Sequence, residues 1–254
     1  APRSEMEMRS LPRPGHADYA AWTKYRLDDL TVYAERSSAR WTAALVSIGS
    51  IASQMLSKLG IEIVGSVVAI GKVHCSIPES VCVVARDASP VYCHDPLASC
   101  EMVAEIEKAI DRGDTLGGIF AVSAFGLPPG IGGYGELFER LDSKIGRYFM
   151  AIPSVKGVFV GNSDVSLPGS QYHDPFTVSD GRVARRSNNA GGVEGGISNG
   201  QPVVVVASVK PIPTLGNGID SVNLKNMNVE KTPYVRSDVT AVPAASVVGE
   251  SMLD

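Results

Sequence analysis

Two short clusters near the start of the chain carry residue types that bind anions. Residues 13–18 read Arg-Pro-Gly-His-Ala-Asp, and residues 36–40 read Arg-Ser-Ser-Ala-Arg, directly before a long segment with helical spacing of apolar residues. Helix N-termini, hydroxyl groups and guanidinium groups can together hold a phosphate in a fixed position. The second cluster taken alone is also explained by a capped, solvated helix start, so both interpretations stay open here.

The overall charge restricts the partners that the chain can have. It has 254 residues, of which 44% are hydrophobic, with a formal net charge of -4 and a pI near 5.6. Such a chain can bury a full core, but it has no global basic field for nucleic acid or an anionic membrane. No apolar run reaches the length of a membrane span, and the first residues lack the order of a signal peptide. We therefore expect a cytoplasmic protein, without nucleic acid or membrane partners, that binds anions through local clusters.

Four cysteines, two of them beside histidines, raise the question of a metal site. They form no Cys-x-x-Cys pair, and their spacing fits no standard structural zinc framework. Free cysteines are most often buried and unreactive, so the sequence favours thiols without a metal over a zinc protein. The residues concerned are Cys75, Cys82, Cys93 and Cys100, with His74 and His94 as the neighbouring histidines.

Apolar periodicity predicts a chain of mixed helices and strands. Helices are expected over residues 38–59, 99–112 and 134–150, and from Pro243 to the end of the sequence. Strands are expected over residues 61–73 and 81–86, which are rich in valine and isoleucine, and over the segments 117–126, 157–161, 192–197 and 202–209. Because helices and strands do not alternate strictly, the order argues against a doubly wound parallel sheet.

Three further polar clusters follow predicted strands or precede the last helix. Residues 188–200 are rich in glycine and asparagine, residues 210–214 read Lys-Pro-Ile-Pro-Thr, and residues 236–238 read Arg-Ser-Asp. Glycines let the backbone approach a ligand or another strand closely, and strand ends often carry binding residues. Taken singly, a glycine-rich hairpin and an ordinary ion pair explain the first and last of these clusters better than a binding site does.

The combination of motifs is much more specific than any one of them. Their order along the chain resembles the chorismate synthase family over essentially the whole sequence. The segments that carry the resemblance are 13–18, 36–40, 113–118 (Gly-Asp-Thr-Leu-Gly-Gly), 152–157 (Ile-Pro-Ser-Val-Lys-Gly), 191–200, 210–214, 236–238 and 241–246.

The resemblance implies a fold, a reaction and an assembly. The implied fold is α+β, a sandwich of antiparallel sheets covered by helices, as a single domain over residues 1–254 and assembled as a homotetramer. Chorismate synthases convert 5-enolpyruvylshikimate 3-phosphate to chorismate and phosphate by a trans-1,4 elimination in the shikimate pathway. The reaction needs reduced FMN without net redox change. How the flavin is reduced stays open, because no NADP-binding or other nicotinamide fingerprint is visible.

The resemblance also implies roles for individual residues. His16 would donate a proton beside flavin and substrate, and Asp238 would relay the proton that the substrate ring loses. The substrate anions would be bound by Arg13, Arg40 and Arg236, and no metal is implied. The residues that match the FMN site are Ser38, Arg40, Ser154, Lys210, Thr214, Arg236 and Ser237.

The sequence also departs from the family pattern. Family members begin with a block that carries Gly-Glu-Ser-His-Gly, whose histidine is a second catalytic residue, and this block is not in the sequence. Trp41 stands where the family usually has glutamate, and Leu45 stands where an arginine is common. We therefore expect little turnover from this polypeptide alone. The alternative function is that of a non-catalytic or degenerate paralogue or fragment, which retains part of a flavin or anion pocket.

Overall fold

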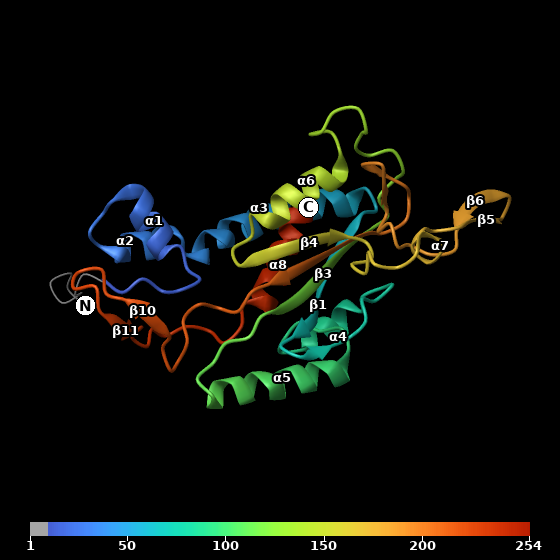
Figure 1. Ribbon diagram of the computed structural model, residues 1–254. Coiled ribbons are helices and arrows are strands. Elements are labelled where there is room, and N and C mark those ends of the chain that lie inside the picture. The colour runs from blue at the N-terminus through green and yellow to red at the C-terminus, as the bar shows by residue number, and fades with distance from the viewer. Residues whose placement is uncertain (1–9) are drawn as a thin grey trace.

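Valine-rich strands form a five-stranded antiparallel sheet at the centre of the protein (Figure 1), whose computed structural model describes residues 10–254. β-Branched residues fit a pleated, buried surface well, and Val67, Val122 and Val205 are fully buried in three neighbouring strands. In spatial order the strands are β2 (Val73–His74), β1 (Glu62–Ile70), β3 (Gly118–Phe125), β9 (Val203–Val209) and β4 (Val155–Val160).

Helices pack on the sheet and complete a large hydrophobic core, and a second, small cluster of Val68, Ala121 and Val206 lies apart from it. Helix α8 (Val242–Leu253) packs on β1 and β3, and α3 (Thr42–Lys58) packs on α8. Helix α5 (Pro96–Asp111) contacts β1 and β2, whereas α6 (Leu141–Met150) contacts β4, so these two helices lie at opposite edges of the sheet (Figure 1). None of the helices within residues 10–254 is long and apolar enough to cross a membrane.

Two glycines allow α3, α8 and the sheet to pack closely. A Cβ atom added at Gly49 of α3 would lie 2.4 Å from the Cβ atom of Ser251 in α8. A Cβ atom added at Gly249 of α8 would lie 2.5 Å from the ring of Phe120 in β3. Such distances are far below van der Waals contact, so no larger residue fits at either crossing without displacement of its neighbours.

Helix α3 is buried on one side only. Its predicted apolar pattern is present, but the side that faces away from α8 is in contact with solvent. The strongly exposed residues on it are Ile48 (64%), Ile51 (63%) and Met55 (66%), and Leu59, directly after the helix, is 75% exposed.

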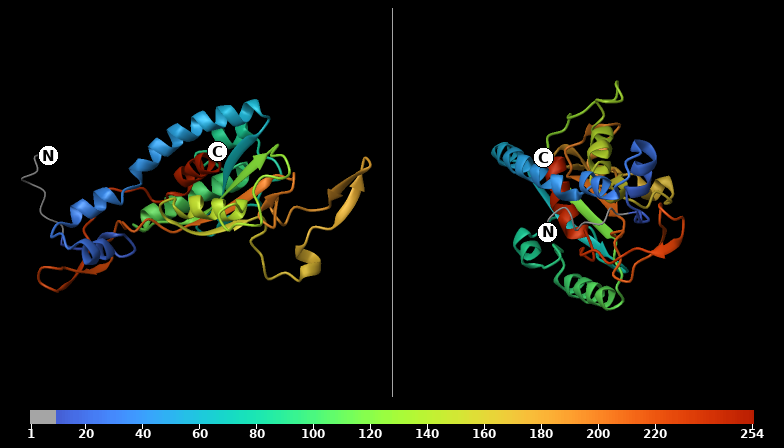
Figure 2. Two further views of the ribbon diagram at one scale, coloured as in Figure 1. Left: turned by 90° about the horizontal axis from the view of Figure 1, so that it is seen from above. Right: turned by 90° about the vertical axis from the view of Figure 1, so that its left-hand side faces the viewer.

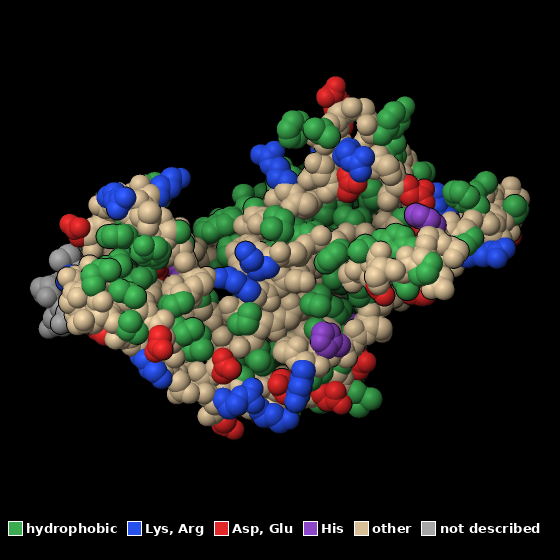
Figure 3. Space-filling view, viewed as in Figure 1, with side chains coloured by type: hydrophobic (Ala, Val, Ile, Leu, Met, Phe, Trp, Pro, Cys, Tyr) green, Lys and Arg blue, Asp and Glu red, His purple; other side chains and the backbone are tan. Residues whose placement is uncertain are grey.

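Small elements extend from the two ends of this body (Figures 1 and 2). At one end, a lobe contains α1 (Asp18–Tyr25), α2 (Leu30–Arg36), the 3-10 helix η2 (Ala39–Trp41) and the hairpin of β10 (Asp220–Val222) with β11 (Val229–Lys231). Apolar side chains gather on the surface of α1 and α2 (Figure 3). At the other end, an arm carries α7 (Gly169–Tyr172) and the hairpin of β5 (Phe176–Ser179) with β6 (Arg182–Arg185), next to the hairpin of β7 (Val193–Glu194) with β8 (Ile197–Ser198).

Most predicted elements are confirmed, but three predictions are wrong. Residues 192–197 do not form one strand, because a turn at residues 195–196 separates β7 from β8. Residues 81–86 do not form a strand; most of this segment belongs to α4 (Val83–Ala88), where the Arg86 side chain donates hydrogen bonds to the carbonyl oxygen of Gly65 and to Glu250. Residues 134–140 are not helical, because their apolar side chains, such as Phe138 (78% exposed), have no core to pack against. The single domain expected over residues 1–254 includes residues 1–9, which lie outside the described residues.

Candidate functional site

Arg13, His16 and Asp18 form a hydrogen-bonded cluster where the lobe of α1 and α2 begins. His16 Nδ1 donates to Asp18 Oδ1 over 2.6 Å, and Arg13 Nε donates to Asp18 Oδ2 over 2.8 Å. The backbone N–H of Arg13 also donates to Asp18 Oδ2, over 3.1 Å. The Asp18 side chain is only 4% exposed, whereas those of Arg13 and His16 are 16% and 17% exposed. The carboxylate is therefore buried beneath two side chains that remain accessible.

A tight turn in the backbone brings Arg13 and His16 together. The His16 N–H donates to the carbonyl oxygen of Arg13 over 3.1 Å, with Pro14 and Gly15 at the two central positions. Gly15 has φ of 79°, and the order Pro-Gly with positive φ at the glycine is typical of a type II turn. Helix α1 begins two residues after His16, at Asp18. The Arg-Pro-Gly-His-Ala-Asp order thus determines the local geometry of the cluster.

The hydrogen bonds to Asp18 determine its charge. Burial raises the pKa of Asp18, but the hydrogen bonds that it accepts from His16 and Arg13 outweigh burial and place the pKa well below the usual range. The carboxylate is therefore ionised at neutral pH and accepts a hydrogen bond from the Nδ1–H group of His16. Nε2 is then the unprotonated ring nitrogen, and it accepts a hydrogen bond from Arg13 Nη2 over 3.2 Å. A proton can enter or leave the ring at this atom only when that hydrogen bond opens.

The end of β9 supplies the other side of the cluster. Lys210 follows β9, and its Nζ atom donates to the carbonyl oxygen of Gly15. Arg13 Nη1 lies 3.5 Å from the hydroxyl group of Thr214, and the Ser237 hydroxyl donates to the carbonyl oxygen of Thr214 over 3.1 Å. The structure therefore brings Arg13, Lys210 and two of the predicted hydroxyl residues to one place.

Ser154 adjoins this group through the backbone. Its carbonyl oxygen accepts from the N–H of Lys210 over 2.9 Å. Its φ of 71° lies in the left-handed region, which residues other than glycine rarely adopt. Residues in such conformations are often found at functional sites, and the position of Ser154 in the FMN site stays a prediction.

The donor groups of this cluster suit a phosphate-bearing ligand such as FMN. Two permanent cations, Arg13 and Lys210, lie near one buried carboxylate, and the hydroxyl groups of Thr214 and Ser237 add neutral donors. Cations and hydroxyl groups are the usual protein ligands of phosphate. Arg13 and Asp18 also line a cavity of about 380 Å³, but the rest of its wall comes from residues such as Leu30, Asn223 and Glu230, and neither Lys210 nor Thr214 borders it.

Four other predicted site residues lie apart from these contacts. Ser38 caps η2 by accepting from the backbone N–H of Arg40 over 3.4 Å, and the Arg40 side chain is 86% exposed. This geometry agrees with the simpler interpretation of residues 36–40 as a capped helix start. Arg236 and Asp238 are exposed, and across residues 10–254 neither side chain takes part in a hydrogen bond or an ion pair.

The glycine-rich segment 188–200 lies before β9, at the end opposite Lys210. It is anchored by Asp174, which accepts from the Ser187 hydroxyl and from the backbone N–H groups of Asn189 and Ala190. Burial raises the pKa of Asp174, but these hydrogen bonds outweigh burial and lower the pKa overall. A Cβ atom added at Gly191 would lie 2.2 Å from the backbone N atom of Gly161. The glycines therefore serve close backbone packing.

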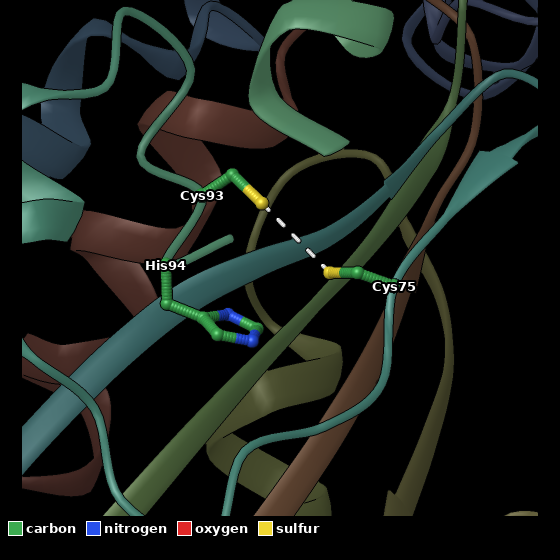
Figure 4. A group of neighbouring side chains, drawn as sticks. All are labelled: Cys75, Cys93 and His94. Carbon is green, nitrogen blue, oxygen red and sulfur yellow. Dashed lines mark hydrogen bonds between the residues drawn. The ribbon is translucent and has the colours of Figure 1, made fainter. Parts of the chain in front are cut away.

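A second cluster, Cys75, Cys93 and His94, lies beside the sheet (Figure 4). The two sulfur atoms are 3.8 Å apart, and Nδ1 of His94 is 2.9 Å from the hydroxyl oxygen of Ser66. The hydrogen bond between the thiols, together with burial, raises the pKa of Cys75. The same hydrogen bond lowers the pKa of Cys93 to about 7. Burial lowers the pKa of His94, so its imidazole is neutral at pH 7.

Sequence reasoning assigned no role to Asp18, although it lies in the motif that drew attention. The available signal was its position two residues after His16 and five after Arg13. Spacing did not show that the Pro-Gly turn and the start of α1 would place both side chains on one carboxylate. The sequence raised a metal site at its cysteines and histidines and favoured free thiols, but spacing did not show that Cys75 meets Cys93 and His94, because the two segments come together only through the fold.

Comparisons with known proteins agree with the fold and with the motif order. A sequence model described as chorismate synthase matches residues 3–254. The chorismate synthase of Thermotoga maritima is 54% identical over 250 residues, which are 97% of this chain and 66% of the relative. That of Desulforudis audaxviator is 48% identical over 252 residues, which are 95% of this chain and 64% of the relative. This chain thus spans about two thirds of the length of these relatives.

A solved structure gives the same result. A protein described as "Crystal Structure of Chorismate Synthase" superposes with a TM-score of 0.78 at 36% identity, covering 93% of this chain and 67% of that chain. The predicted α+β fold class, with an antiparallel sheet covered by helices, is confirmed. Sequence and structure agree over nearly the whole chain, and the chain therefore belongs to the chorismate synthase family.

Proposed function

We propose that the protein is a lyase that converts 5-enolpyruvylshikimate 3-phosphate to chorismate and phosphate. In this elimination the C–O bond to phosphate breaks, a ring proton leaves, and a new C=C double bond forms. The observation that carries the proposal is the pairing of His16 with buried Asp18 beside Arg13 and Lys210. Membership of the chorismate synthase family supports the reaction and its substrate.

The cofactor in this proposal is reduced FMN. When bound, it supplies electron density that assists cleavage of the bond to phosphate, without net oxidation. Arg13 and Lys210, with the hydroxyl groups of Thr214 and Ser237, would hold the anionic groups of cofactor and substrate. Fixed cations of this kind stabilise the charge that develops on a departing phosphate, most strongly where water is excluded.

His16 would move the proton in this site. Asp18 holds Nδ1 of the ring over 2.6 Å, so that Nε2 is oriented for proton transfer. A positioned histidine acting as general acid typically contributes about 10²- to 10⁴-fold to the rate. His16 would deliver its proton to the reduced flavin or to the departing phosphate, and Asp18 would stabilise the positive charge of the ring before delivery.

The roles proposed for Ser38, Arg40, Arg236 and Asp238 depend on a bound ligand. Arg40 and Asp238 are exposed, so they are available to close on substrate and flavin. Asp238 would then take up the ring proton, and Arg236 would bind a substrate carboxylate. Localisation in the cytoplasm, assembly as a homotetramer and reduction of the flavin by NADPH, which is oxidised to NADP, belong to the same proposal. The exposed apolar side of α3 is a surface that self-association would cover.

The competing proposal is a non-catalytic member of the family that retains a flavin or anion pocket. Titration with FMN followed by an anaerobic assay for chorismate and phosphate, with reduced FMN present, separates the two. Binding together with turnover supports the lyase, and binding without turnover supports the non-catalytic alternative. A chain that neither binds nor turns over overturns both proposals and leaves a structural role. Light scattering of the same sample measures the assembly.

A further inference from the structure

Cys75, Cys93 and His94 come from two segments that the fold brings together at one edge of the sheet. Cys75 follows β2, and the other two residues lie in the loop before α5. Their potential ligand atoms, two sulfurs and one imidazole nitrogen, all lie within 4.8 Å of one another. Figure 4 shows both thiols pointing toward each other with the imidazole ring beside them. This cluster shares no residue with the site around His16.

The separation of the sulfur atoms matches that of two thiolates on one tetrahedral zinc ion. Zinc–sulfur bonds are about 2.3 Å long, so two of them at a tetrahedral angle place the sulfurs about 3.8 Å apart. The Sγ atoms of Cys75 and Cys93 are 3.8 Å apart. Little rearrangement of either side chain is therefore needed to place a metal ion between them.

Ser66 orients the imidazole ring as metal-binding histidines require. Its hydroxyl oxygen lies 2.9 Å from Nδ1 of His94 and accepts from the His94 backbone N–H over 3.2 Å. The Ser66 hydroxyl itself faces the carbonyl oxygen of Tyr92 at 3.3 Å, to which it can donate. Nδ1 of His94 is then the ring donor, and Nε2 keeps a free lone pair. Histidine ligands usually donate their other ring N–H in this way.

Burial and charge also suit a cation at this position. Cys93 is 1% exposed, whereas Cys75 and His94 are partly exposed and leave a path for an ion and for a fourth ligand such as water. Two thiolates balance the charge of one divalent ion, so a neutral unit is buried. We propose that Cys75, Cys93 and His94 form a three-residue site for a thiophilic divalent cation, with Zn²⁺ as its ion.

Binding of Co²⁺ and Zn²⁺ to the tag-free, reduced protein tests this proposal. We expect one Co²⁺ per chain, with absorption typical of tetrahedral coordination by thiolates, displaced by one equivalent of Zn²⁺. Cys75→Ser and Cys93→Ser should abolish the thiolate band, and His94→Gln should weaken it. Ser66→Ala should lower the zinc affinity about 10- to 100-fold, since it acts through His94. The matched control is Cys82→Ser/Cys100→Ser, which removes the two exposed cysteines and should leave binding unchanged.

Alkylation of the unaltered protein keeps the test independent of variant folding. Zn²⁺ should slow alkylation of Cys75 while leaving Cys82 and Cys100 as reactive as before, as mapped by mass spectrometry. Equal reactivity of Cys75 with and without Zn²⁺ overturns the proposal, and so does Co²⁺ absorption that survives Cys75→Ser. If the protein takes up no Co²⁺, the contact between Cys75 and Cys93 is only a hydrogen bond between two thiols. This result also overturns the proposal.

Discussion

Nδ1 of His16 lies 2.6 Å from Oδ1 of Asp18, and this short contact joins a partly exposed ring to a carboxylate that is 4% exposed. The same carboxylate accepts three N–H groups of Arg13, over 2.8 to 3.1 Å. Asp18 thus holds the Arg13 and His16 side chains in one orientation, while its own carboxylate is largely buried. We infer that Asp18 is a positioning residue and that His16 acts through Nε2.

Asp18→Asn should lower kcat while leaving KM nearly unchanged. Asparagine keeps the size of the side chain but removes the charge that holds Nδ1–H, so His16 is no longer fixed in one tautomer. We expect a loss of about 10²-fold or more in kcat, in the range for a misplaced general acid. Nuclear magnetic resonance of the His16 ring should lose the signal of the hydrogen-bonded Nδ1 proton. A purely structural role of Asp18 would lower the amount of folded protein without changing kcat per folded molecule.

Asp18 should also contribute to the loss of stability in acid. Its folded-state pKa lies below the unfolded value of about 3.9, so the unfolded chain binds the proton more readily. The contribution is present above about pH 4 and is lost as the pH falls from there toward the folded-state pKa. The difference in free energy of unfolding between the wild type and Asp18→Asn should therefore shrink from pH 6 to pH 2. Urea denaturation across this range measures it, and a constant difference contradicts the expectation.

Much of the body could be predicted from the sequence because local pattern and burial agree there. The apolar runs of β1, β3 and β9 and the proline in the first turn of α8 are such cases. Prediction failed at residues 81–86, whose valines suggest a strand, because contacts of Arg86 with Gly65 and Glu250 stabilise a short helix. Long-range contacts of this kind cannot be read from a local window of sequence.

The candidate site was predictable by residue type and motif order, but its geometry was not. Arg13 and Thr214 are 201 positions apart, and only the path of the chain after β9 brings them within 3.5 Å. Arg40 belongs to the same predicted set, yet its side chain is exposed and pairs only loosely with Glu35. A family motif therefore indicates which residues are candidates for the binding site. The fold determines which of these residues are already in contact before a ligand binds.

Gly249→Ala should destabilise the protein, whereas Gly146→Ala should not. The first change places a Cβ atom 2.5 Å from the ring of Phe120, and such overpacking typically costs about 1–3 kcal/mol. Gly146 lies in α6 with no atom within 4 Å of an added Cβ, so alanine should stabilise that helix by about 0.4–1 kcal/mol. Thermal and urea unfolding of both variants provide the comparison. Equal effects of the two changes would show that the α8 crossing is looser than described.

Arg86→Met should lower the free energy of unfolding by about 2 kcal/mol at neutral pH. This estimate lies between the typical cost of breaking an exposed ion pair and that of breaking a buried one. Arg86 pairs with Glu250, and their side chains are 11% and 22% exposed. Burial raises the pKa of Glu250, against the hydrogen bonds from Gly65 and Arg86. Loss of Arg86 raises this pKa further, so the folded state favours protonated Glu250. The free energy of unfolding of the variant then declines as the pH rises above about 4.3. The variant should therefore lose more stability relative to the wild type at pH 8 than at pH 4.5. Arg112→Met, at an exposed arginine, is the control, and denaturation at both pH values measures the difference.

Lys210→Met should weaken binding of FMN at least tenfold. Lys210 lies at the end of β9 and contacts Gly15 of the turn that carries Arg13 and His16, so its charge faces the same place as theirs. Each charge-assisted hydrogen bond to a phosphate contributes about 1.5–3 kcal/mol, which corresponds to a loss of tenfold or more. Fluorescence titration with FMN measures the affinity, and Lys231→Met, on the exposed β11, is the matched control. Riboflavin lacks the phosphate, so its affinity should change much less than that of FMN if Lys210 contacts this group. An equal loss for both ligands would instead assign Lys210 to the ring or to the folding of the turn.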